Sequence, residues 1–170
     1  LALDYAALVR DELSQLDPPN AEYYAGNYAL FESRIQALDR AIQAAVASIP
    51  PANRKLLTYH DSWAYFALRY GMQVIGAVQP SNFSEPSSRE VARLIDQVRD
   101  EAIPAVFGSE VFPSAVLEQI ASEAGARFVD QLADDDLPGA PGDPRHSYLG
   151  LMAQNMEVMV EALGGDPSLL

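Results

Sequence analysis

Cysteine is absent from the 170 residues, and only two residues are histidine. The lack of cysteine excludes a disulfide framework and any thiolate site for a metal or a redox reaction. No apolar run approaches the roughly 20 residues that a membrane-spanning helix needs, and the chain shows neither an initiator methionine nor a targeting segment. We therefore expect no direct membrane span, and we expect the chain to be cut from a longer protein.

Basic residues are also scarce. Lysine and arginine number 11 against 24 acidic residues, which gives a net charge of −13. This charge repels nucleic-acid backbones and anionic membranes, so we expect no nucleic-acid partner, whereas a cation as cargo is compatible with it. The motifs G-x-S-x-G, G-x-x-x-x-G-K-[ST] and G-x-G-x-x-G are missing too, so no familiar catalytic or phosphate-binding loop is indicated.

The first fifty residues predict two helices. Apolar residues recur with a helical period over residues 2–15, and the sequence DPPN at 17–20 ends that helix. Over residues 24–49, apolar residues step by three and four, which is typical of one face of a helix of about seven turns. Since about three turns is usual in compact domains, this helix is expected to be half of a coiled coil or a strut across a larger structure.

From residue 54 onward, short apolar runs alternate with amphipathic helices. Four such alternations are typical of a parallel sheet covered by helices, so the sequence predicts an α/β fold with a four-stranded parallel sheet. Ser87 and Glu90 form a capping box, and Gly71 and Gly125 follow helix ends, where left-handed residues are expected. The predicted strands are residues 56–59, 72–78, 105–108 and 126–129, and the predicted helices are residues 62–70, 87–101, 113–124 and 146–163.

Polar residues lie at the end of each predicted strand. His60 and Asp61 follow the first run, and Glu85 lies in the loop after the second. Glu110 comes after the third run, and Asp130 ends the fourth. In an open parallel sheet, ligands bind beyond the carboxyl ends of the strands. An imidazole with carboxylates suits zinc or manganese better than magnesium or calcium, so these residues predict a polar edge able to bind metal.

Each of these residues also has a structural interpretation. Asp61 precedes a predicted helix and fits an N-cap, Glu85 fits an exposed loop carboxylate, and Glu110 fits a capping residue. His60 fits a histidine whose hydrogen bonds are satisfied at a strand end, and with Asp130 alone it cannot make a tight tetrahedral site.

The alternative function is a small metal-dependent hydrolase or lyase that uses His60, Glu110 and Asp130.

Five segments share their order with a known protein family. Residues 16–49 contain LDPPN and the long periodic helix, and residues 58–76 read TYHDSWAYFALRYGMQVIG. Residues 84–110 hold an E-P-S loop with a helix and a strand, residues 126–132 read ARFVDQL, and residues 146–163 form a closing helix. Together they resemble the C-terminal half of the solute-binding receptors of zinc/manganese ABC transporters, the metal-receptor lipoprotein family.

The resemblance implies one lobe of a two-lobed fold like that of periplasmic binding proteins. Residues 1–50 would be an N-terminal helix and the long interlobe backbone helix, and residues 51–170 a metal-binding (β/α)4 lobe. The N-terminal lobe would be absent from this chain. The implied function is an extracytoplasmic receptor, periplasmic or a cell-surface lipoprotein, which delivers a divalent metal to ABC permease subunits and catalyses no reaction.

The resemblance also implies a ligand set. His60 takes the third ligand position and Asp130 the fourth, two histidines come from the other lobe, and Glu110, Glu85 and Asp61 support the ligands from outside. One Zn(II) or Mn(II) per intact protein is implied, and the imidazole of His60 favours zinc. This chain alone is expected to bind metal weakly or not at all, and its uncovered cleft is expected to favour self-association. A cell-adhesion module without metal function is a third possibility.

Overall fold

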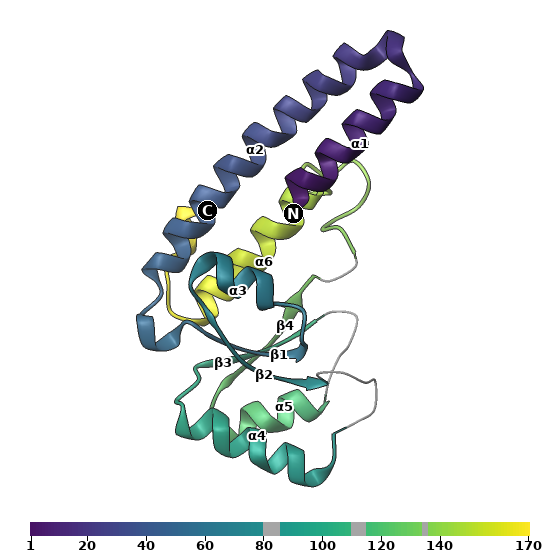
Figure 1. The fold of residues 1–170 in the computed structure, drawn as a ribbon. Helices are drawn as coiled ribbons and strands as arrows, with labels where there is room; N and C mark the ends of the chain where they lie inside the picture. Colours follow the sequence, from purple (N-terminus) through teal and green to yellow (C-terminus); the bar gives the residue numbers. More distant parts are fainter. Residues whose placement is uncertain (80–85, 110–114, 134–135) are drawn as a thin grey trace. The chain divides into compact units, whose positions relative to one another are not determined.

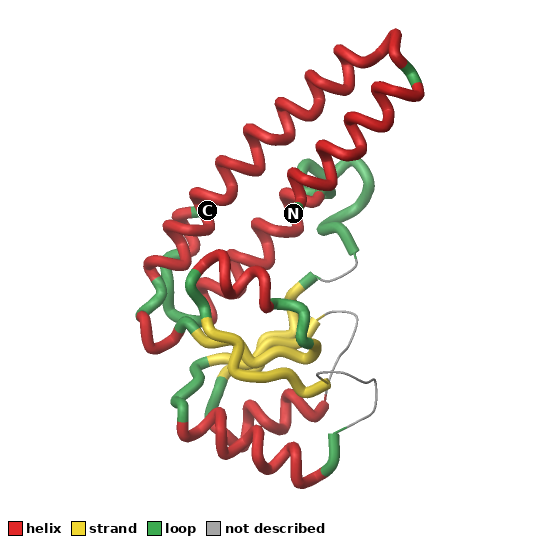
Figure 2. The backbone as a smooth tube through the Cα atoms, in the orientation of Figure 1, coloured by secondary structure: helices red, strands yellow, loops and turns green. Residues whose placement is uncertain are grey.

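The computed structural model describes residues 1–79, 86–109, 115–133 and 136–170 (Figures 1 and 2). It divides the chain into two compact units, Leu1–Ala41 and Ile42–Leu170, with the boundary inside one long helix. The predicted division at residues 50 and 51 concerns the lobes of a longer protein and stays a prediction.

The first unit is a pair of helices. Helix α1 (Ala2–Leu16) is followed by a 3-10 turn, η1 (Pro18–Asn20), and by α2 (Ala21–Ser48), which continues into the second unit. The Arg10 guanidinium lies 4.4 Å from the centroid of the Tyr28 ring, and the Tyr24 hydroxyl donates to Asp17 at 2.9 Å. That hydrogen bond raises the pKa of Tyr24. The predicted long helix is confirmed; its 28 residues correspond to about 42 Å at a rise of about 1.5 Å per residue.

The second unit contains a four-stranded sheet in the order β2-β1-β3-β4. Every neighbouring pair is parallel, which confirms the predicted fold class. The strands are β1 (Lys55–His60), β2 (Gln73–Gln79), β3 (Ala105–Ser109) and β4 (Arg127–Leu132). The helices are α3 (Ala64–Tyr70), α4 (Ser88–Asp100), α5 (Ala115–Ala124) and α6 (Tyr148–Ala162), with 3-10 turns η2 (Pro51–Asn53) and η3 (Pro167–Leu169).

Helices cover both faces of the sheet. In Figure 1, α4 and α5 lie on one face, and α3 and α6 on the other. Adjacent residues Leu56 and Leu57 are both fully buried, as expected when neither face of a parallel sheet meets solvent. Leu57 and Val106 pack with the apolar sides of α4 and α5. The strands therefore read as continuous apolar runs, which is why the sequence located all four.

The local signals at helix ends mostly hold. Ser87 and Glu90 form the predicted capping box at the start of α4, and Gly71 and Gly125 have φ of 70° and 76°. The prediction that Asp61 is the N-cap of the next helix is wrong. The N–H of Ser62 donates to the His60 carbonyl at 3.0 Å, so the chain turns after β1 and α3 starts only after Trp63, its N-cap residue.

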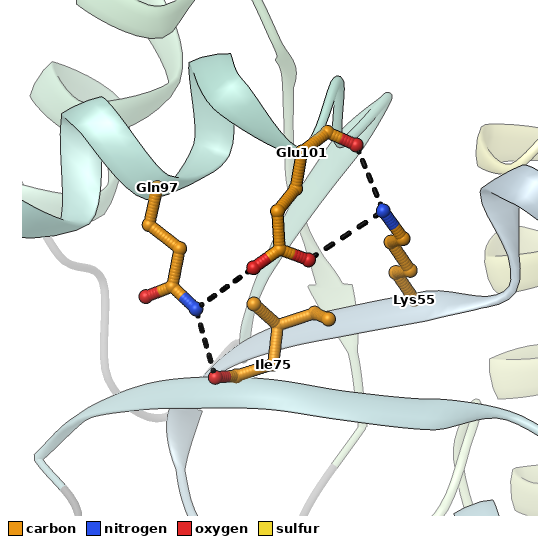
Figure 3. Close-up of polar contacts among 4 residues, drawn as sticks. All are labelled: Lys55, Ile75, Gln97 and Glu101. Carbon is orange, nitrogen blue, oxygen red and sulfur yellow. Dashed lines mark hydrogen bonds and ion pairs between the residues drawn. The ribbon is translucent and has the colours of Figure 1, made fainter.

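A polar network joins α4 to the two strands beside it (Figure 3). The Lys55 Nζ donates to the Glu101 carbonyl at 2.9 Å and lies 3.5 Å from the Glu101 Oε2. The Gln97 Nε2 donates to the Ile75 carbonyl and to the Glu101 Oε1, both at 3.2 Å. Because Lys55 begins β1, this network fixes the amino end of the strand and leaves its carboxyl end to other contacts.

Candidate metal site

His60 is the last residue of β1 and stands at the carboxyl edge of the sheet. Its side chain is half-buried, and its Nε2 is shielded from solvent. The Thr58 hydroxyl donates to the His60 carbonyl at 2.7 Å, and the Tyr59 ring meets the imidazole edge-on, with centroids 4.6 Å apart. The backbone and ring of His60 are thus held by their own strand.

A small pocket opens beside His60. Its interior volume is about 10 Å³, which is about the space of one water-sized sphere. Trp63, the sole tryptophan of the chain, lines it together with Thr58, Tyr59, His60, Ser62, Phe107, Gly108 and Leu132.

Asp130 lies in a bulge of β4. Phe107 pairs with Val129 and Ser109 with Leu132, so two residues of β4 lie opposite one residue of β3. Asp130 is one of those two residues and is exposed, whereas Leu132 is buried. Bulges re-aim side chains and are common beside functional sites.

β3 separates β1 from β4 in the sheet. The backbones at His60 and Asp130 are therefore about 10 Å apart, two inter-strand spacings of about 4.8 Å. An imidazole, a carboxylate and two metal–ligand bonds of about 2 Å each are long enough to bridge this span. The described residues thus place both predicted ligands at one edge of the sheet, but the residues that line the pocket beside His60 do not include Asp130.

The structure describes only one of the three carboxylates that were predicted to support the ligands. Asp61 is exposed in the turn after β1, and Glu85 and Glu110 lie outside the described residues. Within the described ranges, no three histidine or carboxylate side chains gather closely enough to hold a metal ion. The second histidine, His146, lies elsewhere, with its Nδ1 3.2 Å from the Pro138 carbonyl oxygen.

Buried polar residues concentrate at this same edge. Among the described residues, three polar side chains are buried: Thr58, Gln79 and Asn155. Gln79 ends β2 and pairs with His60, and Thr58 bonds the His60 carbonyl. Asn155 binds the backbone just beyond β4. Burying a polar group is unfavourable unless it is hydrogen-bonded. Three buried polar residues near one edge therefore indicate that this edge has a role beyond ending the strands.

Sequence reasoning missed these three residues. A signal for Asn155 was present, because it interrupts the apolar stripe of α6 between Leu151 and Met159 at a spacing of four. A polar residue at such a position points inward. Thr58 and Gln79 gave no comparable signal, since threonine is common in strands and Gln79 ends its run.

The fold defines the class of protein: an α/β unit with a four-stranded parallel sheet and helices on both faces (Figure 1). Residues 1–162 match the family model described as ZnuA, zinc-uptake complex component A, periplasmic. The chain belongs to this family, as its resemblance to metal receptors had implied.

Three relatives that are named as metal-binding proteins align with most of the chain. It is 29% identical over 164 residues to the iron-binding protein YfeA of Yersinia pestis, with 96% of the chain and 52% of that protein covered. It is 27% identical over 159 residues to the zinc-binding protein TroA of Treponema pallidum (91% and 52% covered). It is 24% identical over 161 residues to the manganese-binding lipoprotein MntA of Halalkalibacterium halodurans (95% and 53% covered). The chain therefore spans about half the length of these relatives.

Solved structures agree with the fold. The periplasmic zinc-binding protein TroA from Treponema pallidum superposes with a TM-score of 0.81 at 25% identity, covering 92% of this chain and 58% of that chain. The manganese-bound periplasmic metal-binding protein from Candidatus Liberibacter asiaticus gives a TM-score of 0.81 at 25% identity, covering 95% and 59%.

These comparisons decide between the functional classes. The relatives are named as metal-binding or metal-uptake proteins, not as enzymes, and the hydrolase or lyase alternative has no support. In the part of the chain that the structure describes, no helix combines the length and apolarity that crossing a membrane requires.

Proposed function

We propose that this chain is the C-terminal lobe and interlobe helix of the extracytoplasmic solute-binding component of an ABC importer for a divalent transition metal. The family match over residues 1–162 carries this proposal. A relative named as a metal ABC transporter substrate-binding lipoprotein, FimA of Streptococcus parasanguinis, supports it with 21% identity over 159 residues. The partners would be the metal, the permease subunits and an N-terminal lobe like the half of the relatives that this chain does not span.

His60 and Asp130 would supply the ligands of this lobe. Their common position at the carboxyl edge of the sheet supports the assignment, as does the small pocket beside His60. Two ligands leave a metal mostly hydrated, because structural zinc sites use four protein ligands and catalytic zinc sites three. Tight capture would therefore require the other lobe, and the metal would be held between the two.

Zinc would be favoured over manganese at this site. A neutral imidazole is a good ligand for zinc, whereas manganese prefers oxygen donors, and His60 provides nitrogen. The relatives are named for zinc, manganese and iron, so the preference rests on ligand chemistry alone. Because His60 would provide a nitrogen donor and Asp130 an oxygen donor, the preference for zinc would be modest.

The uncovered apolar face of α1 supports self-association of the isolated chain. Four large apolar side chains of α1, and that of Leu1 before it, are strongly exposed, between 58% and 80%; those of the helix are Tyr5, Leu8, Val9 and Leu16. Contiguous exposed apolar surface favours association. Sedimentation of the chain over a range of concentrations would reveal a dimer; a monomer throughout would count against this part of the proposal.

Calorimetric titration of Zn(II) and Mn(II) tests the central proposal. Three samples are needed: this chain, a longer protein in which an N-terminal lobe precedes it, and the longer protein with His60→Ala. We expect one-to-one tight binding by the longer protein, loss of more than about 100-fold in affinity on His60→Ala, and weak binding by the chain alone. The expected loss exceeds the 10–100-fold range typical when only a partner of a ligand is removed.

Lys55→Ala in the longer protein is the matched control. It lies at the other end of the strand that carries His60 and should leave the affinity unchanged. Equal affinities of the chain and the longer protein would contradict the two-lobe proposal, because the site would then be complete within these residues. Unchanged binding after His60→Ala would remove His60 from the ligand set.

A further inference from the structure

Asn155 joins α6 to the end of β4 by two hydrogen bonds. The Ala133 N–H donates to the Asn155 Oδ1 at 2.7 Å, and the Asn155 Nδ2 donates to the Ala133 carbonyl at 2.8 Å. One side-chain amide therefore pairs with both backbone groups of a single residue, as a neighbouring strand would. Asn155 is only 3% exposed, so these bonds form away from solvent.

The position of this pairing matters because β4 is an edge strand. In the order β2-β1-β3-β4 it has a strand neighbour on one side only, and its pairing with β3 is interrupted between Val129 and Leu132. Beyond that interruption, the ladder continues with the pair of Ser109 and Leu132. Asn155 supplies a partner at Ala133, the first residue after the strand.

The bulge that contains Asp130 is thereby anchored on both sides. On its amino side, Val129 pairs with Phe107. On its carboxyl side, Leu132 pairs with Ser109, and Ala133, which is 9% exposed, is bonded to Asn155. A bulged segment with only one fixed end would let its exposed side chain swing, whereas two fixed ends restrict it.

We propose that Asn155 is the positioning residue for Asp130: by holding the Ala133 peptide, it fixes the bulge from which Asp130 reaches the metal. This inference rests on the proposed function, because anchoring the bulge affects metal binding only if Asp130 binds the metal. Asn155 itself touches no metal. Its effect is on the orientation of Asp130, which lies three residues before Ala133, and residues outside a coordination sphere tune a site in this way.

Nuclear magnetic resonance of the 170-residue chain can separate the two ligands. Mn(II) broadens nearby signals and reports even weak binding, so its titration into labelled chain should broaden signals of both His60 and Asp130. In Asn155→Leu, we expect the apparent Mn(II) affinity to fall about tenfold, and we expect the broadening at Asp130 to fall relative to that at His60, because the ion is then held mainly by His60. The Ala133 amide should also lose its protection from hydrogen exchange.

Met159→Ala is the matched control for a general loss of stability, because Met159 is fully buried on the same helix and one turn beyond Asn155. It should leave the ratio of the broadening at Asp130 to the broadening at His60 unchanged. Asn155→Asp retains the acceptor for the Ala133 N–H but loses the donor, so it should give an intermediate ratio, and it keeps the test informative if Asn155→Leu does not fold.

The outcomes are distinguishable. An unchanged ratio in the Asn155 variants, or an equal change in Met159→Ala, would overturn the positioning role. If the longer protein, in which an N-terminal lobe precedes this chain, shows no effect of Mn(II) or Zn(II) at His60 or at Asp130, the ligand assignment of the proposed function fails instead, and the inference falls with it.

Discussion

The two ends of β1 both carry polar residues, but these residues have different partners. At the amino end, Lys55 bonds Glu101 across to α4, and its side chain is 21% exposed. At the carboxyl end, the Thr58 hydroxyl turns back to the His60 carbonyl of the same strand, and Thr58 is 2% exposed. The first arrangement ties elements together, whereas the second fixes the backbone of one residue.

This difference separates polar residues that hold the elements of a sheet together from polar residues that serve a proposed binding site. A partly exposed network between a strand and a helix has an evident role in holding the fold. Buried polar side chains that bond the backbone next to a proposed ligand add specificity at a place where an apolar residue would fill the space equally well. The comparison predicts that variants at the two ends will affect stability and metal binding in different proportions.

The largest effect is expected where β4 leads into α6. A Cβ added at Gly150 would meet the carbonyl oxygen of Arg145 and, at 2.7 Å, its carbonyl carbon. Both are backbone atoms and cannot rotate away, so Gly150→Ala should lower the free energy of unfolding by about 3 kcal/mol, the upper part of the usual range for overpacking. Urea unfolding followed by circular dichroism measures this.

Gly26→Ala is the control for that substitution. Gly26 lies within α2, and an added Cβ there would meet nothing within 4 Å. Because alanine favours a helix interior, we expect a stabilisation of about 0.5–1 kcal/mol at this position. A similar loss of stability at Gly26 and Gly150 would show that the contact with Arg145 is unimportant.

Thr58→Val should give the next largest effect, at the carboxyl end of β1. It keeps the shape of the side chain but removes the hydroxyl that donates to the His60 carbonyl at 2.7 Å. We expect a loss of about 1 kcal/mol in the free energy of unfolding. We also expect weaker Zn(II) binding, seen as a smaller change in the fluorescence of Trp63, which lines the same pocket.

Thr58→Ser retains the hydroxyl and should restore the fluorescence response even if it packs less well. If valine and serine at position 58 respond to Zn(II) alike, the hydrogen bond to the His60 carbonyl does not prepare the site, and the contrast between the two ends of the strand is lost.

Lys55→Met should have a smaller effect, confined to stability. It removes the bond to the Glu101 carbonyl and the ion pair with the Glu101 carboxylate (Figure 3). Partly exposed ion pairs contribute between zero and about 1 kcal/mol, so the midpoint of urea unfolding should fall slightly while the Zn(II) response of Trp63 stays the same. A weakened metal response would mean that the amino end of β1 influences the site.

Much of this fold could be predicted from the sequence because it depends on short-range patterns. The runs around Leu56 and Val106 are buried on both faces, and Gly71 ends a helix where a left-handed residue is needed. The bulge at Asp130 was not predictable, because it exists only relative to β3. The bond from Asn155 to Ala133 spans 22 residues, and the turn that displaced Asp61 from the helix start depends on a local bond to His60.

The smallest effect concerns a carboxylate at the start of α4 and depends on pH. The Ser87 hydroxyl and N–H donate to the Glu90 Oε2 at 2.7 and 2.8 Å, and these bonds lower the pKa of Glu90. A lowered pKa in the folded state contributes stability that is fully present above the unfolded value, near 4.5, and is lost as pH falls through the folded value.

Glu90→Gln should therefore be slightly less stable than the unmodified chain at pH 7, and the difference in urea midpoint should shrink as the pH is lowered below about 4.5. Asp96→Asn, on the exposed side of the same helix, is the control, because Asp96 forms an exposed ion pair with Arg99. A difference for Glu90→Gln that stays constant from pH 7 to pH 3 would show that the capping bonds do not depend on the charge of Glu90.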